Sequence, residues 1–149
     1  MKAILVIAAI VLFVHPSLDA QNLKPYILGA EASSSISEAQ SAVKTQLKKQ
    51  GIKILGSYTP AGDKKRFVFA VSSSDLISAV KSIGGLTGFA AALRVALTEE
   101  KGKILISYTN PPYWGNAYFR DDFDKVKKHY DKFSIRLNKA MSGCGKAVG

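Results

Sequence analysis

Apolar positions along the chain repeat with two spacings, and the spacing assigns most segments to a helix or a strand. Four apolar residues from Ile36 to Leu47 recur every three or four positions, which predicts one buried helix face. Ser35 and Glu38 fit a capping box at the start of this helix, and Gly51 ends it. Lysines on the opposite side complete an amphipathic pattern.

Two segments that follow have the patterns of strands. Residues 52–58 alternate between apolar and polar side chains, as in a half-buried strand. Pro60 to Lys64 is turn material, and the continuous apolar run from Phe67 to Val71 predicts an interior strand. We expect the two strands to form a hairpin.

A second helix is predicted after the serine cluster at residues 72–74, with an end at Gly84 and Gly85. Its expected buried side consists of Leu76, Ile77, Val80 and Ile83.

Residues 89–98 have an ambiguous pattern. They contain many residues that favour helices, but Leu93, Val95 and Leu97 alternate with smaller or polar side chains. We interpret 89–98 as a strand, because residues 99–102 resemble a hairpin loop and 103–108 alternate as a second strand.

The last third of the chain predicts an aromatic loop and a long helix. Pro111 and Pro112 stop the preceding strand, and residues 110–120 read as a loop. Asp121 is placed to cap the longest helix, whose apolar stripe we expect to dock on the sheet. A short coiled coil is the alternative use of that stripe, which consists of Phe123, Val126, Tyr130, Phe133, Leu137 and Met141.

The predicted architecture is α+β. With a weak strand at residues 26–28, the element order is β-α-β-β-α-β-β-α. Hairpins joined by helices favour a mostly antiparallel or mixed sheet with helices packed on one face. We expect a single domain over residues 21–149, with an ordered core from about 26 to 141 and a loose C-terminal tail after Gly143.

The first twenty residues have the layout of a secretory signal peptide. Lys2 precedes twelve apolar residues, and His15 and Pro16 end that run. A spanning helix needs about 20 apolar residues, so this run is too short to cross a bilayer. Cleavage after Ala20 is expected, and it predicts a periplasmic or secreted protein without a transmembrane anchor.

The net charge and the predicted location together limit the classes of partner that we expect. The formal net charge is +10, and it stays +10 without the leader, which holds one basic and one acidic residue. An exported basic protein favours a small ligand or an anionic envelope component, and nucleic acid is not expected. A solvated basic surface without a partner is the alternative reading, and the oligomeric state is left open.

Four segments resemble the bacterial domain of unknown function family 302, over about residues 37–141. They are residues 43–52, the apolar run 67–71, the hairpin 93–108 that ends at Asn110-Pro111, and the closing helix. The resemblance implies a small α+β domain, often exported or membrane-associated, and it carries no catalytic residue over. Asn110 stands where an acidic residue is expected in many members of that family.

Catalytic and metal-binding signatures are sparse, so no catalytic residue, metal site or cofactor is predicted. Without the leader, His129 and Cys144 are the only imidazole and thiol, too few for a usual zinc site. We expect His129 to be a solvated surface residue and Cys144 to lie unpaired on the tail. Asp121, Asp122 and Asp124 suit a helix start better than an acid pair.

The candidate binding segment is the aromatic loop from residue 110 to 120. Aromatic walls with a few polar groups are typical of small-molecule sites, although aromatics after a strand also pack over the core. We predict a non-enzymatic binding module, with an enzyme whose site is scattered or an assembly protein as alternatives. The candidate ligand-binding residues are Asn110, Tyr113, Trp114, Asn116, Tyr118 and Arg120.

Overall fold

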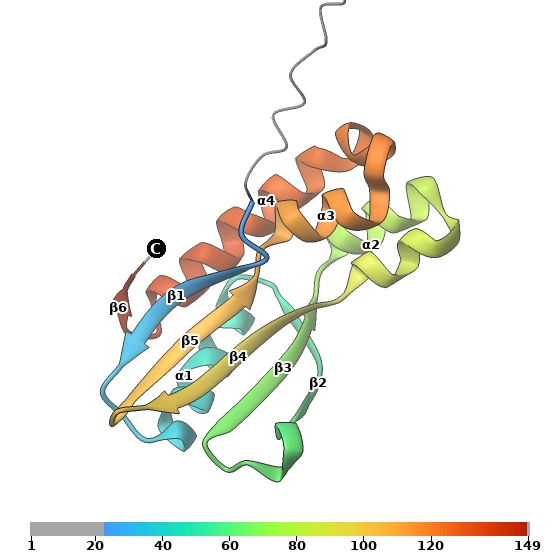
Figure 1. Ribbon diagram of the computed structural model, residues 1–149. Coiled ribbons are helices and arrows are strands. Elements are labelled where there is room, and N and C mark those ends of the chain that lie inside the picture. Colours follow the sequence, from blue (N-terminus) through green and yellow to red (C-terminus); the bar gives the residue numbers. More distant parts are fainter. Residues whose placement is uncertain (1–22, 149) are drawn as a thin grey trace, which may run out of the picture.

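The computed structural model describes residues 23–148 and shows an antiparallel sheet with helices on one face (Figure 1). The six strands lie in the order β2-β3-β4-β5-β1-β6. The helices are α1 (Ile36–Lys49), α2 (Ser74–Ile83), α3 (Pro111–Phe119) and α4 (Phe123–Ser142). The strands are β1 (Tyr26–Ala32), β2 (Lys53–Tyr58), β3 (Arg66–Ser72), β4 (Leu93–Glu100), β5 (Lys103–Thr109) and β6 (Lys146–Ala147), and short 3-10 turns are η1 (Pro60–Gly62), η2 (Gly85–Ala91) and η3 (Arg120–Asp122).

The α+β class, the antiparallel sheet and the placement of the helices on one face are confirmed. Helices α1 and α4 contact the strands directly, while α2, η2 and α3 gather beside α4 at one end of the sheet (Figure 1). The opposite face of the sheet carries no helix in this part of the chain. The predicted signal peptide lies outside the described residues and stays a prediction.

Helix α1 begins and ends as its sequence predicts. The Ser35 side chain accepts from the Glu38 amide and the Glu38 carboxylate accepts from the Ser35 amide, which completes the capping box. Gly51 takes a φ of +66°, and Ile52 N–H donates to the Leu47 carbonyl at 2.9 Å, which closes the helix in a Schellman motif.

The core lies between the sheet and α1 and α4. Inward positions of the three central strands meet the apolar stripes of these helices, and the stripe of α4 is fully buried. The coiled-coil alternative for this stripe is therefore wrong, because the domain's own sheet covers it. The largest side chains buried here include Tyr130, Phe69, Phe133, Leu47, Leu97 and Leu137.

Two predictions in the middle of the chain need correction. The strand predicted over residues 89–98 begins at Leu93, because residues 85–91 form η2, which is anchored where the Tyr130 hydroxyl donates to the Ala90 carbonyl at 2.9 Å. The hairpin turn is shorter than predicted and uses Lys101 and Gly102, both with positive φ. Ile77, predicted to be buried, is 39% exposed, because α2 turns its neighbours toward the core instead.

The predicted aromatic loop is helix α3. Pro111 occupies the first turn, where a missing N–H costs nothing, so the prolines that stop β5 also start a helix. Asp121 lies within η3 rather than at the cap of α4, and the residue at that cap, Asp122, makes no side-chain capping bond.

The C-terminal segment is ordered rather than loose. Strand β6 pairs with β1 through Ala147 opposite Ala30, and Cys144 is 7% exposed within the core. Strand β1 likewise runs to Ala32, beyond the predicted end at Leu28, because its second half pairs with both β5 and β6. The ordered fold therefore continues to Val148.

Helices long and apolar enough to span a bilayer are absent from the described part of the chain.

Candidate functional site

The six residues predicted as a site occupy different environments in the structure. Asn110 is 7% exposed and ties the start of β1 to the end of β5, since its Nδ2 donates to the Lys24 carbonyl at 2.8 Å and its N–H to the Pro25 carbonyl. Asn116 donates back to the Pro112 carbonyl within α3. Arg120 ends α3 with a φ of +50°. These three residues therefore have structural roles.

The aromatic members of the predicted site divide between core and surface. Trp114 and Tyr118 pack against the core with ring centroids 4.9 Å apart, and Tyr118 lies 6.5 Å from the exposed ring of Phe89 on η2. Tyr113 is exposed on α3. The structure thus brings Trp114 and Tyr118 together, whereas Asn110 lines a separate hollow of about 240 Å³ beside Pro111 and Ser134.

A different set of residues meets on the uncovered face of the sheet, where strand register aligns them. Tyr58 lies opposite Val68, Val68 opposite Ala96, and Ala96 opposite Ser107, so one row crosses four strands. The next row on the same face contains Arg94, with Thr109 on β5 and its partner Tyr26 on β1. Side chains two apart on a strand share a face, so the two rows adjoin.

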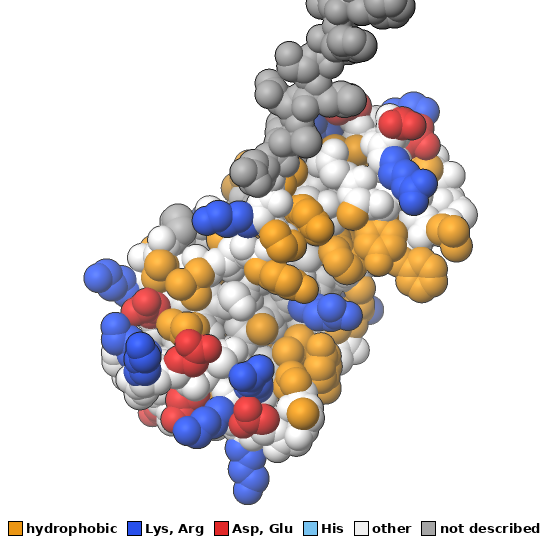
Figure 2. Space-filling model, viewed as in Figure 1, with side chains coloured by type: hydrophobic (Ala, Val, Ile, Leu, Met, Phe, Trp, Pro, Cys, Tyr) orange, Lys and Arg blue, Asp and Glu red, His pale blue; other side chains and the backbone are white. Residues whose placement is uncertain are grey.

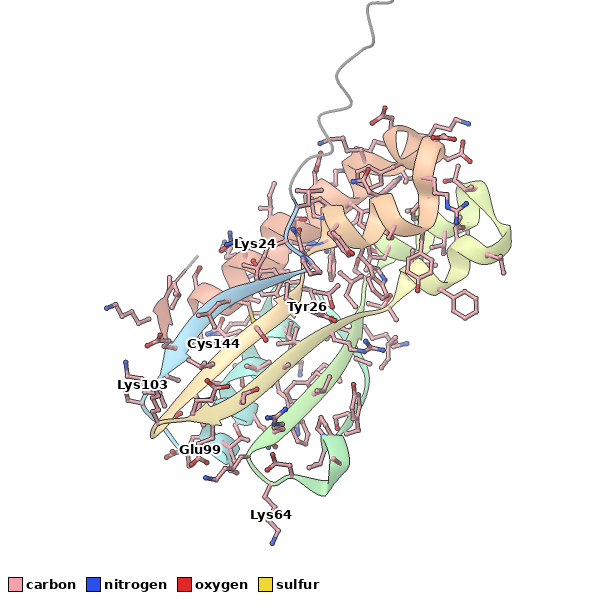
Figure 3. The ribbon with its side chains drawn as sticks, viewed as in Figure 1. Lys24, Tyr26, Lys64, Glu99, Lys103 and Cys144 are labelled. Carbon is pink, nitrogen blue, oxygen red and sulfur yellow. The ribbon has the colours of Figure 1, made fainter. Side chains whose placement is uncertain are left out.

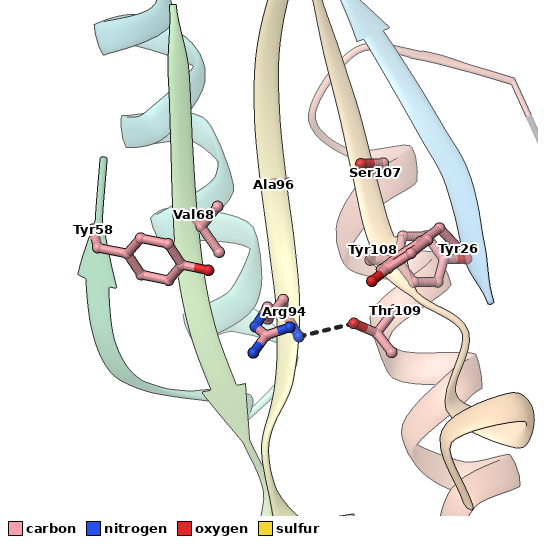
Figure 4. Close-up of a pocket in the computed structure, with 8 residues that line it drawn as sticks. All are labelled: Tyr26, Tyr58, Val68, Arg94, Ala96, Ser107, Tyr108 and Thr109. Atoms are coloured by element: carbon pink, nitrogen blue, oxygen red, sulfur yellow. Dashed lines mark hydrogen bonds between the residues drawn. The ribbon is translucent and has the colours of Figure 1, made fainter. Parts of the chain in front are cut away.

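These rows enclose a hollow of about 330 Å³. Small side chains form its floor, while Tyr58 and Tyr26 approach from opposite sides with Arg94 between them (Figure 4). The Arg94 N–H donates to the Thr109 hydroxyl at 3.2 Å, which joins the backbone of β4 to a side chain of β5. The lining residues are Tyr26, Tyr58, Val68, Arg94, Ala96, Ser107, Tyr108 and Thr109.

Arg94 has no acidic partner in the described part of the chain. Among residues 23–148, no carboxylate oxygen lies within 4.0 Å of its guanidinium, whereas Arg66 pairs with Asp63 and Arg136 with Asp75. The guanidinium is exposed, always charged and has five N–H donors. It is therefore available to an anion that enters the hollow.

The uncovered face is polarised along the strands. Apolar side chains gather toward α3 and η2 and over β2, and charged side chains of both signs surround the opposite end (Figure 2). Glu99 and Lys103 lie at that far end, away from Tyr26 (Figure 3), and Lys103 pairs with Glu31 at 3.0 Å. The hollow thus lies in the apolar half of the face.

The hollow is lined by neutral side chains and one cation. Its lining contains hydroxyls and one guanidinium but no carboxylate, imidazole or thiol to act as a base. Burial raises the pKa of Tyr108 above its ordinary value, and the phenol is protonated at neutral pH as a solvated tyrosine also is.

Four side chains that a scattered active site could use, Tyr58, Tyr108, Tyr113 and His129, do not meet at one place. His129 is not a solvated surface residue, since its side chain is 23% exposed and its Nδ1 lies 3.9 Å from an Asp75 oxygen between α2 and α4. Tyr58 and Tyr108 line the hollow on the sheet, and Tyr113 lies on α3. The described residues bring no three His, Cys, Asp or Glu side chains together as metal ligands.

Cys144 is unsuited to link two chains. Its thiol donates to the Ala140 carbonyl at 3.2 Å and lies in the core, and burial raises its pKa to about 11. The assembly route through this cysteine therefore has no support in the structure.

Comparison with known proteins defines the class by fold. No family model and no curated protein matches the chain. A solved structure titled as the crystal structure of an uncharacterized conserved protein DUF302 from Bacillus stearothermophilus superposes with a TM-score of 0.70, at 14% sequence identity, over 82% of this chain and 99% of that chain. The chain therefore has a DUF302-like fold, which confirms the predicted resemblance at the level of fold.

The hollow was missed because its lining residues come from five strands, and their proximity depends on the register of strand pairing. One signal was present in the sequence. The outward positions nearest Arg94 on β4 and β5 hold only small or hydroxyl side chains, namely Ala96, Ser107 and Thr109.

Proposed function

We propose that this protein is an exported, non-enzymatic binding domain whose ligand occupies the hollow on the uncovered face of the sheet. The observation that carries the proposal is Arg94, an unpaired guanidinium set between two tyrosines over a floor of small residues. The volume of the hollow, about 330 Å³, lies within the size range of small-molecule sites.

The chemistry indicates a small ligand with a flat apolar body and a carboxylate. Guanidinium groups bind carboxylates through two parallel hydrogen bonds. The rings of Tyr26 and Tyr58 supply apolar walls, and the Ser107 and Thr109 hydroxyls supply further hydrogen-bonding groups. The floor at Ala96 leaves room for the ligand to lie against the sheet.

Benzoate is a suitable minimal probe, with benzamide as its uncharged counterpart. We expect benzoate to shift the backbone NMR signals of Arg94, Ala96 and Ser107, with a dissociation constant of roughly 1 mM. Benzamide should bind at least about tenfold more weakly, a difference of about 1.4 kcal/mol. Equal shifts from both probes would contradict the proposed role of the guanidinium.

The matched variants are Arg94→Gln and Arg66→Gln, which each remove one arginine from the same face. Arg66 already pairs with Asp63 at 3.2 Å at the far end of β3. Benzoate binding should weaken at least about tenfold in Arg94→Gln and remain unchanged in Arg66→Gln. The proposal fails if both variants bind benzoate as the unmodified protein does.

Export is supported by the basic start, apolar run and small residue at position 20. Expression in a bacterial host followed by fractionation and mass spectrometry tests it. The expected species begins at Gln21 and lies outside the cytoplasm. Protein that retains Met1 and remains in the cytosol would contradict export and leave the sheet-face site to be judged on the NMR titration alone.

A further inference from the structure

Helix α4 presents a stripe of lysines on the side opposite the core. Residues 125, 128, 132, 135 and 139 follow one another at spacings of three and four, so they lie along one face of the helix. All five are exposed, while the apolar stripe on the opposite side is buried. Four of the five are lysines, and the fifth is Ile135.

Three of these lysines have charges that the fold does not use. Lys125 pairs with Asp122 at 2.6 Å, which raises the pKa of Lys125. Among residues 23–148, Lys128, Lys132 and Lys139 have no carboxylate oxygen within 4.0 Å of their ammonium groups. The stripe is therefore a row of free positive charge about three turns long.

Ile135 lies in the middle of this row and is 70% exposed. It separates two shallow hollows, one of about 340 Å³ shared with Lys132 and one of about 240 Å³ shared with Ile27 and Pro112. Exposure of a large aliphatic side chain to water on the outer face of a charged helix does not stabilise the protein. It gains free energy when it enters an apolar or interfacial environment.

We propose that this stripe, Lys128, Lys132, Ile135 and Lys139, docks the domain on a bilayer that contains anionic lipids. Lysines on the polar face of an interfacial helix approach lipid phosphates, while an aliphatic residue inserts at the level of the headgroups. Ile135 is the reason to favour a bilayer over a soluble polyanion, because a polyanion offers no apolar layer for this side chain. The hollow on the sheet is a separate site, so the two proposals stand or fall independently.

Vesicle sedimentation tests the proposal with purified protein whose N-terminus has been determined by mass spectrometry. The vesicles contain phosphatidylglycerol and phosphatidylcholine at 30:70, or phosphatidylcholine alone. Binding is expected only to the anionic vesicles at 50 mM salt, and it should disappear at 500 mM salt, where the screening length falls to roughly 4 Å. Binding that ignores lipid charge would overturn the proposal.

Variants locate the surface. Removing one lysine near an anionic bilayer lowers binding about fivefold, so replacing Lys128, Lys132 and Lys139 with Gln together should lower the partition constant by at least about tenfold. The control replaces Lys48, Lys49 and Lys53 with Gln, which removes the same charge from exposed positions elsewhere. A change below about threefold is expected there, and an equal loss in both triples would overturn the proposal.

Ile135→Ser distinguishes a bilayer from a polyanion. Since Ile135 is exposed, the variant should keep its melting temperature, and vesicle binding should fall about fivefold. Unchanged binding by Ile135→Ser would overturn docking on a bilayer. Docking on a bilayer would also be overturned if inorganic polyphosphate bound the protein more tightly than the anionic vesicles do and Ile135→Ser left both affinities unchanged.

Discussion

Arg136 and Arg94 lie on opposite sides of the sheet, and their surroundings differ. Arg136 belongs to α4 on the covered side, where its guanidinium pairs with Asp75 of α2 and is 30% exposed. Arg94 lies on the uncovered face between two tyrosines and has no carboxylate partner among residues 23–148. The paired arginine holds two helices together, whereas the unpaired arginine is available to a ligand.

The largest expected effect concerns the reactivity of the covered side. Because burial raises the pKa of Cys144 from 9.0 to about 11, its thiolate fraction at pH 8 is roughly 100-fold lower than in an unfolded chain. Iodoacetamide labelling followed by mass spectrometry should be slowed at least that much in the folded protein relative to the protein in urea. Rapid labelling without denaturant would show that the C-terminal segment does not cover the thiol.

The same shift has a consequence for stability at alkaline pH. The folded pKa is the higher one, so the contribution of this thiol is fully present below pH 9 and is lost as the pH rises toward about 11. Urea unfolding of Cys144→Ala should show less of this loss than the unmodified protein.

Asp75→Asn should break the covered side. It leaves the Arg136 guanidinium without its anion between α2 and α4, in a half-buried position. We expect the free energy of unfolding to fall by about 2 kcal/mol, less than for a fully buried pair. Asp131→Asn is the control, because that carboxylate pairs with Lys127 at 2.8 Å on the surface and should contribute less than about 1 kcal/mol.

Ala96→Leu should fill the uncovered face without harming the covered one. The added side chain occupies the floor of the hollow, so benzoate affinity should fall at least about tenfold in an NMR titration. The free energy of unfolding should change by less than about 0.5 kcal/mol, as for surface substitutions in general. Unaltered binding would show that the ligand does not lie on this floor.

Arg94→Gln should have the smallest effect on stability. Because Arg94 has no partner to lose, urea unfolding should give a free energy within about 0.5 kcal/mol of the unmodified protein. A loss as large as that of Asp75→Asn would show that Arg94 has a structural role, and the contrast between the two arginines would disappear.

Sequence periodicity predicted the parts of the fold that are local. The capping box at Ser35, the stripe of α4 and the alternation in β4 and β5 depend on neighbours a few residues away, and all three are confirmed. Helix α3 was missed because its prolines were interpreted as a stop alone. Strand β6 was missed because two residues carry no alternation, and its pairing with β1 joins positions more than a hundred residues apart.

The residues of the hollow were harder to predict from the sequence than the elements of the fold. The aromatic residues near 114 suggested a site because they are close together in the sequence. In the structure Trp114 packs against the core, and Asn110 ties the start of β1 to the end of β5. The hollow joins Tyr26, Tyr58 and Arg94, which become neighbours only when five strands are in register. A single sequence does not contain that register until the pairing of the strands is known.

The position of β6 also determines where a fusion partner or surface tether can be attached without disturbing the fold. The described residues reach the edge of the sheet at β6, beside β1 (Figure 1), and a side chain at Gly145 would collide with the Glu31 carbonyl. A fusion partner or surface tether added after Val148 therefore hangs from this margin and leaves both the tyrosine-lined hollow and the lysine stripe free. Tethers inserted before Gly145 would pull β6 away from β1 and expose the interior around the Cys144 thiol.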